Sequence, residues 1–169
     1  MSQFVSTMRA AAATAALVGG CAWIGPASAA ADSNGDMLAK MLSQGYNTSN
    51  CTLTQGSGGL ASYECGQNPL PNGPTKALFI LYGNSADTAA GFQGASRDLT
   101  VAPCQSGDPA PDTWNFDNSP NTTAGQIACG TGTNDNQPGL VWTNDQNHMV
   151  AGLVGTNAAS LYQWWQTNG

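Results

Sequence analysis

Positively charged side chains are scarce in this 169-residue sequence, which has four Lys and Arg residues against ten Asp and Glu. The formal net charge is −6 at pH 7. A nucleic-acid-binding surface needs clustered Lys and Arg to neutralise phosphates, and the sequence has no such cluster. The same charge balance disfavours attachment to anionic lipid head groups. We therefore expect no nucleic-acid partner.

Histidine is scarce as well, and His148 is the single histidine of the sequence. A Ser-His-Asp triad would have to use His148, yet the sequence has no Gly-x-Ser-x-Gly elbow to present a serine. A zinc site lacks a second histidine. The Gly-rich loop, strand lysine, His-Arg-Asp and Asp-Phe-Gly motifs of protein kinases are also missing. The sequence therefore predicts a protein that is not an enzyme and that carries no metal or cofactor.

Paired carboxylates leave one enzymatic alternative, because a glycosidase needs only two acids on either side of its substrate. Six aspartates in expected loops or turns are the candidates: Asp98, Asp108, Asp112, Asp117, Asp135 and Asp145. Loop acids are more often solvated surface residues. A secreted hydrolase is thus an alternative hypothesis, and a structural or host-facing antigenic protein is another.

Long apolar runs are missing too, apart from residues 10–24. These 15 residues follow Arg9 and precede the small-residue stretch Pro26-Ala27-Ser28-Ala29-Ala30. A membrane span needs about 20 residues, so the run is too short for an anchor. The order of charged, apolar and small segments is typical of a secretory signal. We predict a signal peptide over residues 1–29 and a single extracytoplasmic domain, without a transmembrane span, over residues 30–169.

The five cysteines agree with export. Cys21 lies within the signal, where Val18-Gly19-Gly20-Cys21 makes lipidation of Cys21 a minor alternative. The mature chain would keep an even set, which in an exported protein suggests two disulfides rather than a metal or redox site, since no CxxC spacing occurs. That set is Cys51, Cys65, Cys104 and Cys129.

A hairpin pattern suggests how these cysteines pair. Residues 49–55 and 60–66 flank a Gly-rich turn, as in a β-hairpin. Folding the chain about Gly58 places Cys51 opposite Cys65. We therefore predict the disulfide Cys51–Cys65 and, by elimination, Cys104–Cys129.

The remaining periodicity predicts three helices and further strands. The helices are expected at residues 36–44, 86–97 and 156–166, the first with Gly45 as its stop, the second with Ala89 and Phe92 facing inward. Strands are expected at residues 77–82, 113–116, 124–130, 139–143 and 148–154. Helices segregated against a mostly antiparallel sheet make an α+β two-layer sandwich. We expect a monomer.

The sequence has five tryptophans, which is an unusual number for its length. Exposed aromatic faces flanked by amides suit a glycan or a protein partner. Trp114 lies in a loop-rich stretch, and Trp164 points about 100° away from the apolar stripe of the last helix. Trp114 and Trp164 are therefore the candidate contacts with a ligand or partner, whereas Trp165, on the same stripe as Leu161, is expected in the core.

Several short segments follow one another in a familiar order. They are Tyr63-Glu64-Cys65-Gly66, Phe79-Ile80-Leu81-Tyr82, Cys104 followed by Trp114, Ala124-Gly125-Gln126-Ile127-Ala128-Cys129-Gly130, Val141-Trp142-Thr143-Asn144-Asp145 and Leu161-Tyr162-Gln163-Trp164-Trp165. Together they resemble the small extracytoplasmic domains of mycobacteria that are associated with membrane serine/threonine protein kinases. The resemblance implies a secreted or envelope-located, sensor-like domain that binds an envelope ligand or protein. Those relatives follow a transmembrane helix rather than a signal, which disfavours direct signalling to a cytoplasmic catalytic domain.

Overall fold

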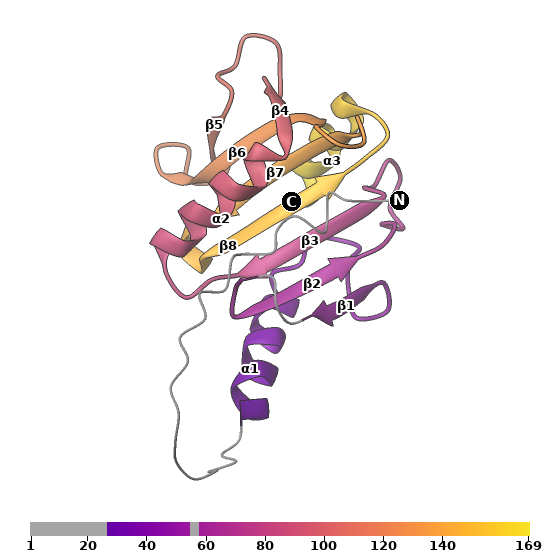
Figure 1. The fold of residues 1–169 in the computed structure, drawn as a ribbon. Helices are drawn as coiled ribbons and strands as arrows, with labels where there is room; N and C mark the ends of the chain where they lie inside the picture. The colour runs from indigo at the N-terminus through magenta and orange to yellow at the C-terminus, as the bar shows by residue number, and fades with distance from the viewer. Residues whose placement is uncertain (1–26, 55–57) are drawn as a thin grey trace.

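The computed structural model describes residues 27–54 and 58–169, with side chains described from Ser33 onward (Figure 1). The elements of this part of the chain are α1 (Ala27–Ala39), β1 (Cys51–Thr54), β2 (Ala61–Cys65), β3 (Lys76–Leu81), α2 (Ser85–Arg97), β4 (Leu99–Ala102), β5 (Asp112–Asn115), β6 (Thr123–Gly132), β7 (Pro138–Asn144), the 3-10 turn η1 (Asp145–Asn147), β8 (Met149–Val154) and α3 (Ala158–Asn168).

The strands form one antiparallel sheet of eight, in the order β1-β2-β3-β8-β7-β6-β4. β5 also pairs with β6, along residues 123–127, whereas β4 pairs with residues 129–132 at the other end of that strand. Both short strands therefore lie along the same edge of β6, opposite β7. The expected α+β fold, with an antiparallel sheet, three helices and two disulfides, is confirmed for the described residues.

Helices cover both faces of this sheet (Figure 1). Successive strand residues point to opposite faces, so the neighbours Val141 and Trp142 of β7 enter different cores. Trp142 belongs to the buried cluster that includes Leu161 of α3 and Leu38 of α1, whereas Val141 belongs to the cluster that includes Phe92 of α2. The helices α1 and α3 thus form with the sheet the two layers that were expected, and α2 adds a layer on the other face.

The hairpin and the strand expected at residues 77–82 match the sequence-based expectation. Cys51 faces Cys65 and Leu53 faces Tyr63 in the β1–β2 register. The disulfide Cys51–Cys65 closes this pair, and Cys104–Cys129 is the second disulfide. The central strand β3 is buried from residue 77 to residue 81, between β2 and β8.

The first helix lies further toward the N-terminus than expected and ends at Ala39 instead of Gln44. The helix is followed by a tighter, 3-10-like turn, in which the backbone N–H groups of Lys40 and Met41 donate to carbonyls three residues back. The Gln44 N–H does not continue the helix, because it donates to the backbone oxygen of Asn168 at the end of α3. A tertiary hydrogen bond thus takes the place of the last helical turn.

Two other expectations about local structure were wrong. Ala89 of α2 is exposed, and Thr88 is buried in its place with its hydroxyl donating to the Asn84 oxygen at 2.8 Å. β4 follows α2 almost directly and was not expected, because its four residues carry no clear alternation.

The signal segment falls almost wholly outside the described residues, as does Cys21 with its possible lipidation. The predicted cleavage point after Ala29 falls in the first turn of α1. Within the described part of the chain, no helix has the length and apolar character needed to cross a bilayer.

Candidate functional site

Aromatic side chains form a connected series of ring contacts on the α3 face of the sheet. Trp165 contacts three rings: Trp114 and Trp142 edge-to-face, with centroids 5.6 and 6.3 Å away, and Tyr162 in a stacked arrangement at 5.7 Å. Trp142 continues the series to Phe79, Phe79 continues it to Tyr46, and Tyr46 continues it to Trp164. The series therefore runs from the buried centre of the sheet to the edge where β5 lies.

Trp164 lies at the buried end of this series, with 4% of its surface exposed, against 9% for Trp165. The expectation that Trp164 is partly exposed was wrong. Its indole meets Tyr46 edge-to-face with ring centroids 6.2 Å apart. Tyr46 belongs to the segment that also bonds Gln44 to the end of α3, so this segment covers the side of α3 that the helix periodicity left open to solvent.

Trp114 is half-buried and firmly oriented. Its indole Nε1 donates a 2.8 Å hydrogen bond to the backbone oxygen of Thr143 on β7. Thr143 is itself buried, and its hydroxyl accepts from the Gln126 N–H and donates to Asp145 Oδ1 at 2.6 Å. The Trp114 ring is therefore held through its polar edge, and its partly exposed surface is apolar.

Phe116 extends this surface into solvent. Its ring meets that of Trp114 at a centroid distance of 4.8 Å and an angle of 75°, yet 44% of the side chain is exposed. Tyr162 of α3 is half-buried and reaches the same group through Trp165. We call Trp114, Phe116 and Tyr162 the aromatic patch; it joins β5, the residue after β5, and α3.

The carboxylate of Asp112 lies next to the aromatic patch. Asp112 precedes Trp114 by two residues on β5, so both side chains share one face of the strand. Their register partners on β6, Ile127 and Gly125, are likewise two residues apart. Burial raises the pKa of Tyr162, the charges of Asp108 and Asp112 raise it further, and a hydrogen bond with Gln166 opposes them. Asp108 and Asp112 thus act on the Tyr162 phenol.

Two small hollows flank the first turn of α3. One, of about 90 Å³, lies beside the Cys104–Cys129 disulfide and is closed by Ala158 and Leu161. The other, of about 70 Å³, is polar and is lined by Asn157 and Ser160 among others. Each of these two hollows is far below the roughly 300 Å³ at which small-molecule sites begin.

His148, Asp135 and Asp145 lie in turns between strands of the sheet. His148 lies between η1 and β8 in the left-handed region, with φ 53°, rather than within a strand. Asp145 accepts from Thr143, and Asp135 Oδ1 accepts from the Gln137 N–H at 3.0 Å. Among the described residues, no group of three or more His, Cys, Asp or Glu side chains is arranged to hold a metal ion.

Comparisons of the chain with protein-family models, with curated proteins and with solved structures found no match. The fold and the patch define an α+β domain with two disulfides and a partly exposed aromatic surface that is held in place by buried neighbours. Of its residues, only Trp114 was singled out from the sequence. Two further residues could have been identified from the sequence. Phe116 is an apolar residue in a polar, Pro-rich stretch, and Asp112 lies two residues before Trp114, on the same face of a strand.

Proposed function

We propose that this protein is an exported, non-enzymatic binding domain of the cell envelope or medium, and that the aromatic patch is its contact surface. The observation that carries the proposal is the 44% exposure of Phe116 on a ring that rests against Trp114. Binding energy at interfaces is concentrated in aromatic side chains held in place by their neighbours. Such a surface loses little conformational freedom on binding.

Export is supported by different observations. Two disulfides persist in oxidising compartments outside the cytoplasm. The N-terminal sequence has the order of segments of a secretory signal. The resemblance to mycobacterial extracytoplasmic domains fits a sensor-like role in the envelope, with an envelope ligand or protein as the partner.

The test compares the retention of variants in a cell-envelope fraction of a mycobacterial host that exports the protein. Phe116→Ala should lower the retained fraction about tenfold or more, because truncating an aromatic hot spot costs about 2 kcal/mol and about 1.4 kcal/mol corresponds to tenfold. Leu60→Ala is the matched control, since Leu60 is 51% exposed and precedes β2 far from β5 in the sheet order. Equal retention of wild type and Phe116→Ala would remove the patch from consideration.

The mature protein gives a second readout. A mass spectrum of the exported form should show a chain that begins at Ala30. A mass that includes residues 1–29, or a lipid on Cys21, would contradict the proposed form of export.

A further inference from the structure

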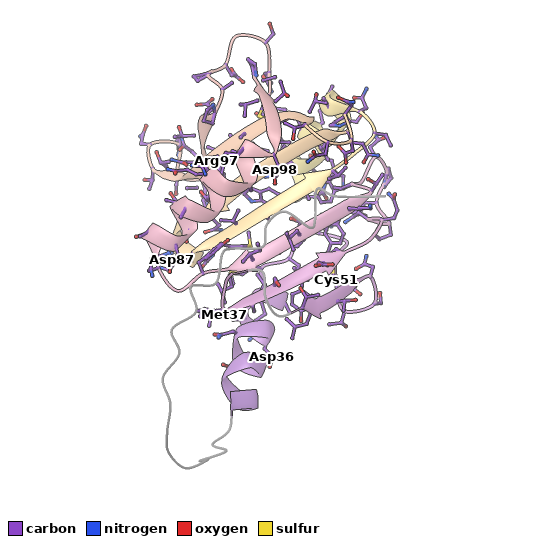
Figure 2. All side chains as sticks on the ribbon, in the orientation of Figure 1. Asp36, Met37, Cys51, Asp87, Arg97 and Asp98 are labelled. Atoms are coloured by element: carbon purple, nitrogen blue, oxygen red, sulfur yellow. A yellow bond between two sulfur atoms is a disulfide. The ribbon has the colours of Figure 1, made fainter. Side chains whose placement is uncertain are left out.

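The charge of this protein is distributed unevenly along the chain. From Asp98 to the C-terminus the sequence has six aspartates and no Lys, Arg or Glu. Every residue of the aromatic patch lies in this region. Of the described basic residues, Lys40 follows α1 and Lys76 begins β3. Arg97 ends α2, which lies on the sheet face opposite α3 (Figure 2).

The negative charge meets the aromatic rings at one place. Asp112 and Trp114 lie on the same face of β5, and Trp114 contacts both Phe116 and Trp165. Tyr162 stacks on Trp165. The faces of aromatic rings are the negative part of their quadrupole and attract cations, most strongly for Trp. Rings and carboxylates at this edge therefore favour the same kind of ligand.

We propose that the aromatic patch binds a basic segment of a partner protein, with a Lys or Arg side chain placed against its rings and near Asp112. This inference rests on the proposed function of the patch as a contact surface. A cationic segment gains both a ring contact and charge complementarity, which speeds association and selects the partner. An anionic partner would meet a region of one negative sign and be repelled.

The test titrates the exported, oxidised protein with two synthetic peptides of equal length, followed by calorimetry and tryptophan fluorescence. One peptide alternates Gly and Arg, and the other carries neutral citrulline in place of each Arg. We expect the Arg peptide to bind at least about tenfold more tightly. Its affinity should fall as salt is added, because exposed charges are screened within about 10 Å at 0.1 M. Equal affinity for both peptides would overturn the inference.

Variants locate the binding. Asp112→Asn and Phe116→Ser should each weaken binding of the Arg peptide about tenfold. Asp135→Asn is the charge-matched control, because Asp135 follows the far end of β6 and its amide replacement keeps the acceptor for Gln137. It should change the affinity by less than about twofold. Equal weakening by Asp112→Asn and Asp135→Asn would mean that net charge alone attracts the peptide, which overturns the inference.

A neutral oligosaccharide, maltohexaose, separates this inference from the proposed function. If maltohexaose binds in a Phe116-dependent manner and the Arg peptide does not, the basic partner is overturned and the patch remains a contact surface. If neither probe shows binding that depends on Phe116, the basic partner is overturned, and envelope retention of Phe116→Ala decides the proposed function.

Discussion

The indole Nε1 of Trp114 donates its hydrogen bond to the backbone oxygen of Thr143 across an intervening strand. β5 and β7 pair with β6 from opposite sides, and the residue of β6 opposite Trp114 is Gly125. A Cβ atom at position 125 would overlap the Thr143 oxygen. The missing side chain of Gly125 therefore lets Trp114 reach β7, which orients the aromatic patch.

Gly125→Ala tests this arrangement. The new methyl group would meet backbone that cannot move freely, so we expect a loss of about 1–3 kcal/mol in the free energy of unfolding and a change in tryptophan fluorescence. Urea denaturation measures the first quantity. Gly94→Ala is the control: nothing lies within 4 Å of its added Cβ, so the helix α2 should gain up to about 1 kcal/mol. Equal stability of the two variants would contradict the crowding at Gly125.

The two adjacent tryptophans of α3 should be equally costly to truncate. Trp164 and Trp165 are both buried, so Trp164→Ala and Trp165→Ala should each lower the free energy of unfolding by about 3–5 kcal/mol. Phe116→Ala, whose ring is far more exposed, should cost clearly less. Thermal and urea unfolding of the three variants give the comparison. A nearly unchanged melting temperature for Trp164→Ala would show that the segment around Tyr46 does not cover this side of α3.

Tyr162 reports on the carboxylates beside it. Its pKa is raised first by burial and then by Asp108 and Asp112. Asp112→Asn removes one of these charges, so the pKa of Tyr162 should move back toward its usual value near 10. Phenolate absorbance during an alkaline titration follows this change, and Tyr162→Phe identifies the transition that belongs to Tyr162. An unchanged transition in Asp112→Asn would place Asp112 away from the patch.

Tyr46 should make stability fall at high pH. Burial raises the pKa of Tyr46 well above 10, while the Asn68 side chain opposes that rise. The folded state therefore prefers the neutral phenol. This contribution is fully present below pH about 10 and is lost as pH rises through the folded pKa. Tyr46→Phe keeps the ring beside Phe79 and should flatten the decline of unfolding free energy with pH, measured by urea unfolding at several pH values. An equally steep decline in the variant would assign it to other groups.

The two disulfides should contribute similarly to the free energy of unfolding, but they restrain different segments of the chain. They close separations of 14 and 25 residues, and the chain-entropy estimate is about 3 kcal/mol for each because it grows slowly with loop length. Replacing Cys104 and Cys129 by Ser should also speed proteolysis within residues 105–111, which that bridge ties to β6. Replacing Cys51 and Cys65 by Ser is the control and should leave cleavage there unchanged.

Local pattern was enough for much of the fold. The hairpin register, with Cys51 opposite Cys65, follows from alternation about a short turn, and the buried central strand follows from an unbroken apolar run. Asn84 directly precedes α2 and caps it, because its side chain accepts from the Asp87 N–H at 2.9 Å. These features depend on residues within a few positions of one another, so local sequence is enough to predict them.

Contacts between distant segments decided the rest. Helix periodicity placed Trp164 at the surface, but the segment that carries Tyr46 lies over it, and no local pattern says which loop covers which helix face. The same holds for the end of α1, where Gln44 bonds to Asn168. The aromatic patch arises only because β5 and α3 meet over the edge of β6. The sequence alone therefore determined which residues are aromatic and acidic, and the packing of segments far apart in the chain decided which of them form one surface.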